Sequence, residues 1–277
     1  MKSYQKIFIY VVLIFISFLT IFPFLWMVIN SFNSSANIFS IPPRIIPDKF
    51  LKPGMFSNYV TVLKEFNFGL FTINSFIVAG GSALGQLLTC TLAGFAFALM
   101  KFRGKNIIFA LLLATMMVPI QVTIIPEFLL MMKLGWLDTF APLIVPSVLV
   151  GSFGTFMFKE FFESMPSSLL DAGSIDGAGT FTMYFRLYLP QSTAQIATLF
   201  IIAFMNNWND LLRPILYINS ERLQTVTMAL TQFQSQYTAK WNLLLTGGVL
   251  SIIPLLVIYI SLQKYIIQGI ASTGTKG

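Results

Sequence analysis

The sequence has no histidine, a single cysteine and few charged residues for its length. Only 10% of its 277 residues are charged, whereas a soluble globular chain carries about a quarter. Because Cys90 is the only thiol and histidine is missing, no set of residues suits zinc, haem or an iron–sulfur cluster, and no disulfide framework can form. These absences exclude most metal centres and the small disulfide-rich folds.

Apolar residues make up 56% of the chain, with 29 phenylalanines and 13 methionines. Runs of about 20 apolar residues are long enough to cross a bilayer as helices. The sequence therefore predicts an all-α, polytopic membrane protein in which residues 1–277 form a single transmembrane domain. The six predicted transmembrane helices cover residues 7–29, 71–100, 107–131, 141–161, 191–208 and 243–265.

The chain begins MKSYQK and continues directly into the first apolar run. That run is longer than the core of a secretory signal and has no small-residue cleavage site, so we interpret it as a retained helix. The net charge of +7 does not indicate nucleic-acid binding, because no basic run exceeds KFRGK at residues 101–105.

KFRGK also predicts the orientation of the chain, because it places three basic residues between the second and third spans. Such clusters are typical of cytoplasmic loops. With six spans, both termini are then expected in the cytoplasm, residues 30–70 form an external loop, and residues 162–190 form a cytoplasmic loop.

Small residues gather in the second predicted span, where Gly81 and Gly85 form a GxxxG pattern. Small residues allow close helix packing in lipid, where association depends on shape. The pattern predicts a tight helix contact, either within the bundle or with another subunit, and we favour packing within the bundle.

An acidic segment rich in small residues, LLDAGSIDGAG at 169–179, lies in the predicted cytoplasmic loop. Ser168 to Asp171 form a capping-box pattern that predicts a helix start, and Gly177 lies where a left-handed residue would end that helix. Helical spacing predicts a second short helix whose apolar face lies against the protein or the membrane, formed by Phe181, Tyr184, Phe185, Tyr188 and Leu189. Such a helix–turn–helix is either a docking element for a partner or a solvated linker between spans.

Residues 166–190, PSSLLDAGSIDGAGTFTMYFRLYLP, resemble the EAA motif of binding-protein-dependent ABC importer permeases, in particular their carbohydrate branch. Asp171, Ala172 and Gly173 stand at the E-A-A positions, and Asp176, Gly177 and Ala178 stand at D-G-A. The departures are aspartate for glutamate at 171 and glycine for alanine at 173. Further segments that resemble this branch are MVPIQVTIIPEF (117–128), NNWNDLLRPI (206–215), FQSQYTAKWNLLLTGGVL (233–250) and QKYIIQGIASTGTKG (263–277).

The resemblance implies a non-catalytic permease subunit of an importer for a sugar or oligosaccharide, located in the bacterial cytoplasmic membrane. The implied partners are a second permease subunit forming a heterodimer, two copies of a cytoplasmic ABC ATPase, and an extracytoplasmic sugar-binding protein. ATP and Mg²⁺ would be bound by the ATPase, so no cofactor is expected in this chain. Asp171, Ala172, Gly173, Asp176, Gly177 and Ala178 would belong to the coupling helix that docks on that ATPase.

Two groups of polar residues in the apolar runs have open roles. Glu127, near the outer end of the third span, either reaches the membrane surface or lies along the sugar path. A cluster where the fifth span ends either contacts sugar or holds a broken helix together: Asn206, Asn207, Trp208, Asn209 and Asp210. In the related maltose-type assembly the partner permease supplies most sugar contacts, so no substrate-binding residue is assigned.

Other functions remain as alternatives. The C-terminal residues 269–276 come near a phosphate-binding loop, but they lack its Gly-Lys-Ser/Thr sequence and a preceding strand, so ATP hydrolysis by this chain is not expected. The resemblance places this tail against the ATPase.

The alternative functions for the whole chain are an ABC permease for another solute such as a polyamine or phosphonate, a secondary transporter, and a membrane-embedded enzyme.

Overall fold

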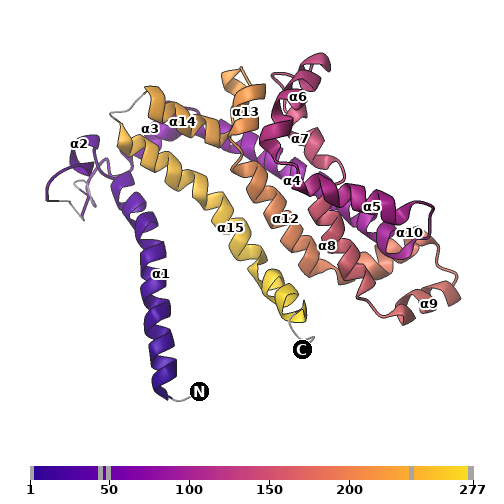
Figure 1. Ribbon diagram of the computed structural model, residues 1–277. Coiled ribbons are helices and arrows are strands. Elements are labelled where there is room, and N and C mark those ends of the chain that lie inside the picture. Colours follow the sequence, from indigo (N-terminus) through magenta and orange to yellow (C-terminus); the bar gives the residue numbers. More distant parts are fainter. Residues whose placement is uncertain (1–2, 43–45, 48–50, 237–239, 274–277) are drawn as a thin grey trace. The chain divides into compact units, whose positions relative to one another are not determined.

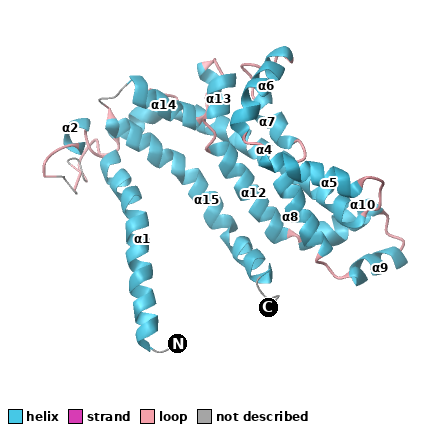
Figure 2. Cartoon of the chain, in the orientation of Figure 1, coloured by secondary structure: helices cyan, strands magenta, loops and turns pink. Residues whose placement is uncertain are grey.

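The computed structural model describes residues 3–42, 46–47, 51–236 and 240–273, and within these ranges every regular element is a helix (Figure 2). Residues 274–277 of the C-terminal tail therefore lie outside the described residues. The helices, labelled in Figure 1, are α1 (Ser3–Ser31), α2 (Ser35–Ile38), α3 (Ser57–Lys64), α4 (Phe68–Leu99), α5 (Lys105–Ala114), η1 (Thr115–Met117), α6 (Ile120–Lys133), α7 (Ala141–Val148), α8 (Ser152–Glu163), α9 (Ser167–Ile175), α10 (Thr180–Met183), η2 (Tyr184–Tyr188), α11 (Leu189–Gln191), α12 (Thr193–Trp208), α13 (Leu212–Tyr217), η3 (Glu221–Leu223), α14 (Val226–Gln236) and α15 (Trp241–Thr273).

Four helical stretches of the described residues are long and apolar enough to cross a membrane: Tyr4–Ser31, Phe68–Leu99, Ala141–Glu163 and Trp241–Tyr265. The number rises to six if each of two bent helix pairs counts as one span. The six spans predicted from the sequence correspond to this larger number. The chain is therefore a multi-pass membrane protein made of helices.

The bends occur where the sequence interrupts helical hydrogen bonding. Lys105–Met117 and Ile120–Lys133 meet at 102°, with Pro119 at the break. Proline lacks an N–H and pushes the residue before it into extended backbone, and Val118 has φ −87° and ψ 112°. The second pair, Thr180–Gln191 and Thr193–Trp208, is bent by 80° directly after Pro190 and Gln191.

The chain forms two compact units, of which the first comprises residues 1–72 and 228–254. Polar side chains in this unit bind the carbonyl groups at the end of α1. Asn58 Nδ2 donates to the carbonyl oxygens of Ser31 and Asn33 at 2.7 and 2.9 Å, and Thr246 Oγ1 donates to that of Ser31 at 3.0 Å. Because the last carbonyls of a helix have no partner in the helix itself, these bonds stabilise its terminus.

The second unit comprises residues 73–227 and 255–277, and its core is a cluster of mainly aromatic side chains contributed by α4, α8, η2 and α12. The fully buried members are Cys90, Phe95, Phe158, Phe162, Tyr184, Tyr188 and Leu199. Gly94 allows α8 to approach α4, because a Cβ atom there would lie 2.5 Å from Phe158 Cβ and 3.1 Å from the backbone nitrogen of Lys159. This contact fixes the position of α8, which leads into the predicted coupling loop.

The GxxxG glycines of α4 face α7 of the same chain. A Cβ at Gly85 would lie 2.3 Å from Val148 Cγ2, and one at Gly81 would lie 3.5 Å from Ile144 Cδ1. The glycines thus provide close helix packing within the bundle, which was the favoured interpretation.

A carboxylate joins two loops of the second unit. Asp138, at φ 59°, accepts hydrogen bonds at Oδ1 from the backbone N–H groups of Asn219 (3.0 Å) and Ser220 (2.7 Å), and at Oδ2 from the Ser220 hydroxyl. The Ser220 hydroxyl, followed by these backbone donors, holds the pKa of Asp138 below its ordinary value of 3.8. The ionised form is therefore the one that the folded loops favour.

We expect Asp138→Asn to lower the melting temperature of the purified protein near neutral pH, because the amide keeps the shape of the side chain but loses its charge. A lowered folded pKa gives stability that is present above the unfolded pKa and is lost as the pH falls through the folded value. The difference in melting temperature between the two proteins should therefore shrink as the pH falls below 3.8. A difference that stays constant between pH 7 and pH 3 would contradict this role for the charge.

Candidate functional site

The segment that resembles the EAA motif forms helix α9 and the turn after it, which Figure 1 shows beyond the end of α8. The prediction that Ser168 and Asp171 form a capping box is wrong. Helix α9 begins at Ser167, two residues earlier than this box predicts, with Pro166 as the N-cap and no side-chain capping bond. Ser168 and Asp171 therefore already lie inside the helix, and Asp171 is exposed.

The end of α9 was predicted correctly at Gly177, which has φ +69°. The N–H of Gly177 donates to the carbonyl of Ser174 at 3.1 Å, and the N–H of Ala178 donates to that of Gly173 at 2.9 Å. These two bonds form a Schellman motif, which requires a left-handed residue at the position of Gly177. The turn is thus a defined structure, and glycine is the residue that adopts it without strain.

The second helix of the loop is present, but it differs from the regular helix that was predicted. Its central part, Tyr184–Tyr188, is a π-helix between α10 and α11. Tyr184 and Tyr188 are buried in the core of the second unit, and the Tyr184 hydroxyl lies 2.6 Å from Thr91 Oγ1 on α4. Phe181 and Phe185, predicted on the same apolar face, are instead 72% and 54% exposed. The loop is therefore attached to α4 through its tyrosines.

The six predicted coupling residues divide into an outer and an inner set. Asp171, Ala172, Asp176 and Gly177 are exposed, and Ala178 is half-buried. Gly173 is buried, and a Cβ there would lie 3.0 Å from Leu187 Cδ1, so glycine in place of the usual alanine lets α9 approach the second helix closely.

Two apolar side chains complete the exposed surface of this loop: Ile175 was not singled out from the sequence, whereas Phe181 was predicted on an apolar face that lies against the protein or the membrane. Ile175 is 86% exposed and Phe181 is 72% exposed, on either side of the Gly177 turn. Asp171 and Asp176 form no ion pair with the residues that the structure describes. An exposed surface with two free carboxylates and two large apolar groups is suited to a basic protein partner.

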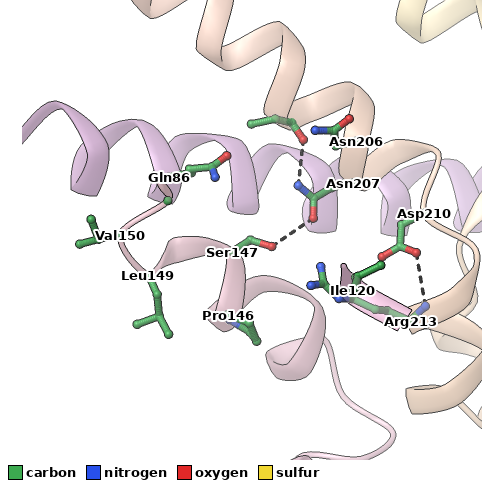
Figure 3. Close-up of a pocket in the computed structure, with 12 residues that line it drawn as sticks. Gln86, Ile120, Pro146, Ser147, Leu149, Val150, Asn206, Asn207, Asp210 and Arg213 are labelled. Atoms are coloured by element: carbon green, nitrogen blue, oxygen red, sulfur yellow. Dashed lines mark hydrogen bonds between the residues drawn. The ribbon is translucent and has the colours of Figure 1, made fainter. Parts of the chain in front are cut away.

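The polar residues of the third and fifth spans lie together in the second unit. Glu127 Oε1 is 3.5 Å from Arg213 Nε of α13, so this acid is paired inside the protein. Trp208 is buried and stacks on Phe204, which leaves it no free face for sugar. Asn207 and Asn209 donate to helix carbonyls one turn back, as expected if they stabilise the end of a helix. Asn206 and Asp210 line a pocket at this place (Figure 3).

Comparison with known proteins identifies the family to which this chain is similar. Residues 90–272 match the family described as the binding-protein-dependent transport system inner membrane component. The lactose transport system permease protein LacG of Rhizobium radiobacter is 30% identical over 261 residues, which cover 94% of this chain and 93% of LacG. The arabinooligosaccharides transport system permease protein AraQ of Halalkalibacterium halodurans is 29% identical over 266 residues, covering 95% of this chain and 94% of AraQ.

A third relative has a different kind of solute in its name. The sn-glycerol-3-phosphate transport system permease protein UgpE of Brucella abortus is 32% identical over 202 residues, covering 72% of this chain and 71% of UgpE. Among solved structures, a chain from a bacterial ABC transporter involved in the import of the acidic polysaccharide alginate superposes with a TM-score of 0.82 at 20% identity. The superposition covers 96% of this chain and 99% of that one, and it shows a shared fold.

The matched residues 90–272 include the whole α9 turn and extend over more than half of the chain. The protein therefore belongs to the binding-protein-dependent transport system inner membrane components, the membrane-spanning permeases of ABC importers.

Proposed function

We propose that the protein is one of two permease subunits of an importer for a sugar or oligosaccharide, with a separate ATPase supplying the energy. The observation that carries this proposal is the family match of residues 90–272, which includes the exposed α9 turn. The names of LacG and AraQ support a sugar as the solute. The protein itself is proposed to be non-catalytic, with ATP and Mg²⁺ bound by two copies of the partner ATPase.

The exposed α9 surface supports the proposed coupling role. Asp171 and Asp176 would pair with basic groups of the ATPase, while Ile175 and Phe181 would enter apolar parts of its surface. The buried Tyr184 and Tyr188 would transmit movement of the loop to α4 and α8, with which they share a core. In this arrangement the loop lies in the cytoplasm, together with both termini and KFRGK, and an extracytoplasmic binding protein delivers the solute to the other side.

Purification of the tagged protein in mild detergent tests this proposal. We expect a second permease and an ATPase to co-purify in near-equal amounts with the chain, and solute uptake by the reconstituted complex to require ATP. The double variant Asp171→Lys, Asp176→Lys should lose most of the ATPase but keep the second permease, because the reversed charges lie only on the α9 surface. A chain that purifies alone, or uptake that continues without ATP, would favour a secondary transporter.

A non-sugar solute is the second candidate, and the name of UgpE favours it specifically. That relative carries a phosphorylated polyol, which is an anion, whereas lactose and arabino-oligosaccharides are neutral. Uptake assays with lactose and with sn-glycerol 3-phosphate separate the two candidates.

A further inference from the structure

A pocket of about 450 Å³ lies in the second unit where helices are interrupted. It is bordered by α4, by the start of α6 after the Pro119 break, by the α7–α8 junction at residues 149–151, and by the end of α12. Irregular backbone at membrane depth occurs only where it is buried in protein or lines a water-filled cavity. In transporters, such broken helices commonly border the solute site.

The polar groups of this pocket come from four helices, α4, α7, α12 and α13, and from the loop between the last two, and they converge on one space (Figure 3). They are Gln86, Ser147, Asn206, Asn207, Asp210 and Arg213. The volume falls within the range of small-molecule sites, which bind their ligands through a few placed polar groups.

Two of these side chains, Gln86 and Asn206, have unused hydrogen-bonding capacity. The amide of Asn207 is instead already bonded within the protein, because its Nδ2 donates to the carbonyl of Ala203 at 2.8 Å and its Oδ1 accepts from Ser147 Oγ at 3.2 Å. The amides of Gln86 and Asn206 make no hydrogen bond to any residue in the described part of the chain. Each offers one acceptor and two donor hydrogens, which match the hydroxyl groups of a polyol, since a hydroxyl both donates and accepts.

Gly151 makes room for one of these amides. A Cβ atom at Gly151 would lie 2.5 Å from Gln86 Nε2, so any other residue would displace the Gln86 side chain. The absence of a side chain at the α7–α8 junction thus lets an amide of α4 occupy the border of the pocket.

The charges at the other end of the pocket disfavour an anion. Arg213 provides one guanidinium, but its Nε lies 3.5 Å from Glu127 Oε1, and its backbone N–H donates to Asp210 Oδ1 at 3.3 Å. Glu127 is not part of the pocket lining, but it compensates the charge of Arg213, so the carboxylate of Asp210 remains as the uncompensated charge of the lining. A phosphate or carboxylate on the solute would meet this charge in surroundings where screening is weak.

We propose that this pocket is a subsite of the transport path that binds a neutral polyol through Gln86 and Asn206 and rejects anionic solutes through Asp210, because Glu127 compensates the charge of Arg213. The proposal rests on the proposed importer function and specifies its solute. Of the two kinds of solute named among the relatives, the subsite suits neutral sugars and disfavours phosphorylated polyols.

Thiol labelling of the purified complex in nanodiscs tests this subsite. Cys90 is fully buried, so the unmodified chain provides a low background, and Val150→Cys places an accessible thiol in the lining of the pocket. We expect lactose at high millimolar concentration to slow maleimide labelling of Val150→Cys several-fold. The same sugar should leave the labelling rate of Lys101→Cys, in the exposed KFRGK loop and outside the pocket lining, unchanged. Under the same conditions sn-glycerol 3-phosphate should protect neither thiol.

Two further variants separate the parts of the proposal. Adding Gln86→Ala and Asn206→Ala to Val150→Cys should abolish protection by lactose while the chain still co-purifies with its partner subunits. Adding Asp210→Asn instead should allow sn-glycerol 3-phosphate to protect, because the amide oxygen can still accept the Arg213 N–H while the charge is removed. No protection by lactose in a complex whose ATPase is present and active, or equal protection by both solutes, would overturn the subsite. Absence of the ATPase itself would instead overturn the proposed importer function.

Discussion

Replacing Gly177 with leucine is expected to abolish ATP-driven uptake while the protein still inserts in the membrane. The left-handed backbone at φ +69° costs a residue with a side chain about 1–2 kcal/mol, so the Schellman turn would rearrange while the buried bundle remains folded. The rearranged turn would displace Asp176 and Ile175 from the surface that is proposed to contact the ATPase. Uptake into proteoliposomes and the amount of protein in purified membranes measure the two effects separately.

Neighbouring positions supply the controls for this prediction. Gly177→Asn should retain most of the uptake, because asparagine tolerates the left-handed region. Gly179→Leu should keep far more activity than Gly177→Leu, because Gly179 has φ −69° and a Cβ there would meet no atom within 4 Å. Normal uptake with Gly177→Leu would remove the α9 turn from the coupling path.

Gly94→Ala is expected to destabilise the protein, because the new side chain would meet the backbone of α8. The added methyl group would lie 2.5 Å from Phe158 Cβ and 3.1 Å from the Lys159 backbone nitrogen, so helix α8 would have to move. Overpacking of this kind typically costs about 1–3 kcal/mol. Because α8 leads into the α9 loop, uptake should fall together with the melting temperature of the purified complex.

Gly80→Ala is the matched control on the same helix, since a Cβ at Gly80 would meet no atom within 4 Å. Alanine is favoured over glycine in a helix by about 1 kcal/mol, so this variant should be as stable as the original protein or slightly more stable. Equal melting temperatures for Gly94→Ala and Gly80→Ala would show that the α4–α8 contact is less tight than the structure indicates.

Features determined by local chemistry could be predicted from the sequence. The apolar runs indicated the spans, because length and hydropathy are sufficient to identify a helix in lipid. Gly177 could be recognised as the end of α9 because few residues other than glycine adopt a left-handed turn. The capping box at Ser168 failed because Pro166, with its fixed φ, already serves as the N-cap two residues earlier.

Features that depend on contacts between distant residues could not be predicted in this way. The pairing of Glu127 with Arg213 joins residues on α6 and α13, and nothing in either segment alone indicates the other. The prolines suggested interruptions, but the 102° bend after Val118 depends on how α5 and α6 pack against their neighbours. The role of Gly151 as space for Gln86 likewise appears only when α4 and the α7–α8 junction lie side by side.

The bend at Pro119 also has a consequence for how the protein is made. The stretch Lys105–Met117 and helix α6, Ile120–Lys133, would each be only about 20 Å long at 1.5 Å per residue, against a hydrocarbon core of about 30 Å. Neither half can leave the translocon as an independent span, because its free terminal carbonyl or N–H groups would enter lipid without partners. Stable integration of this region must therefore wait until α8 and α13, which follow it in the chain and contact it, have been synthesised.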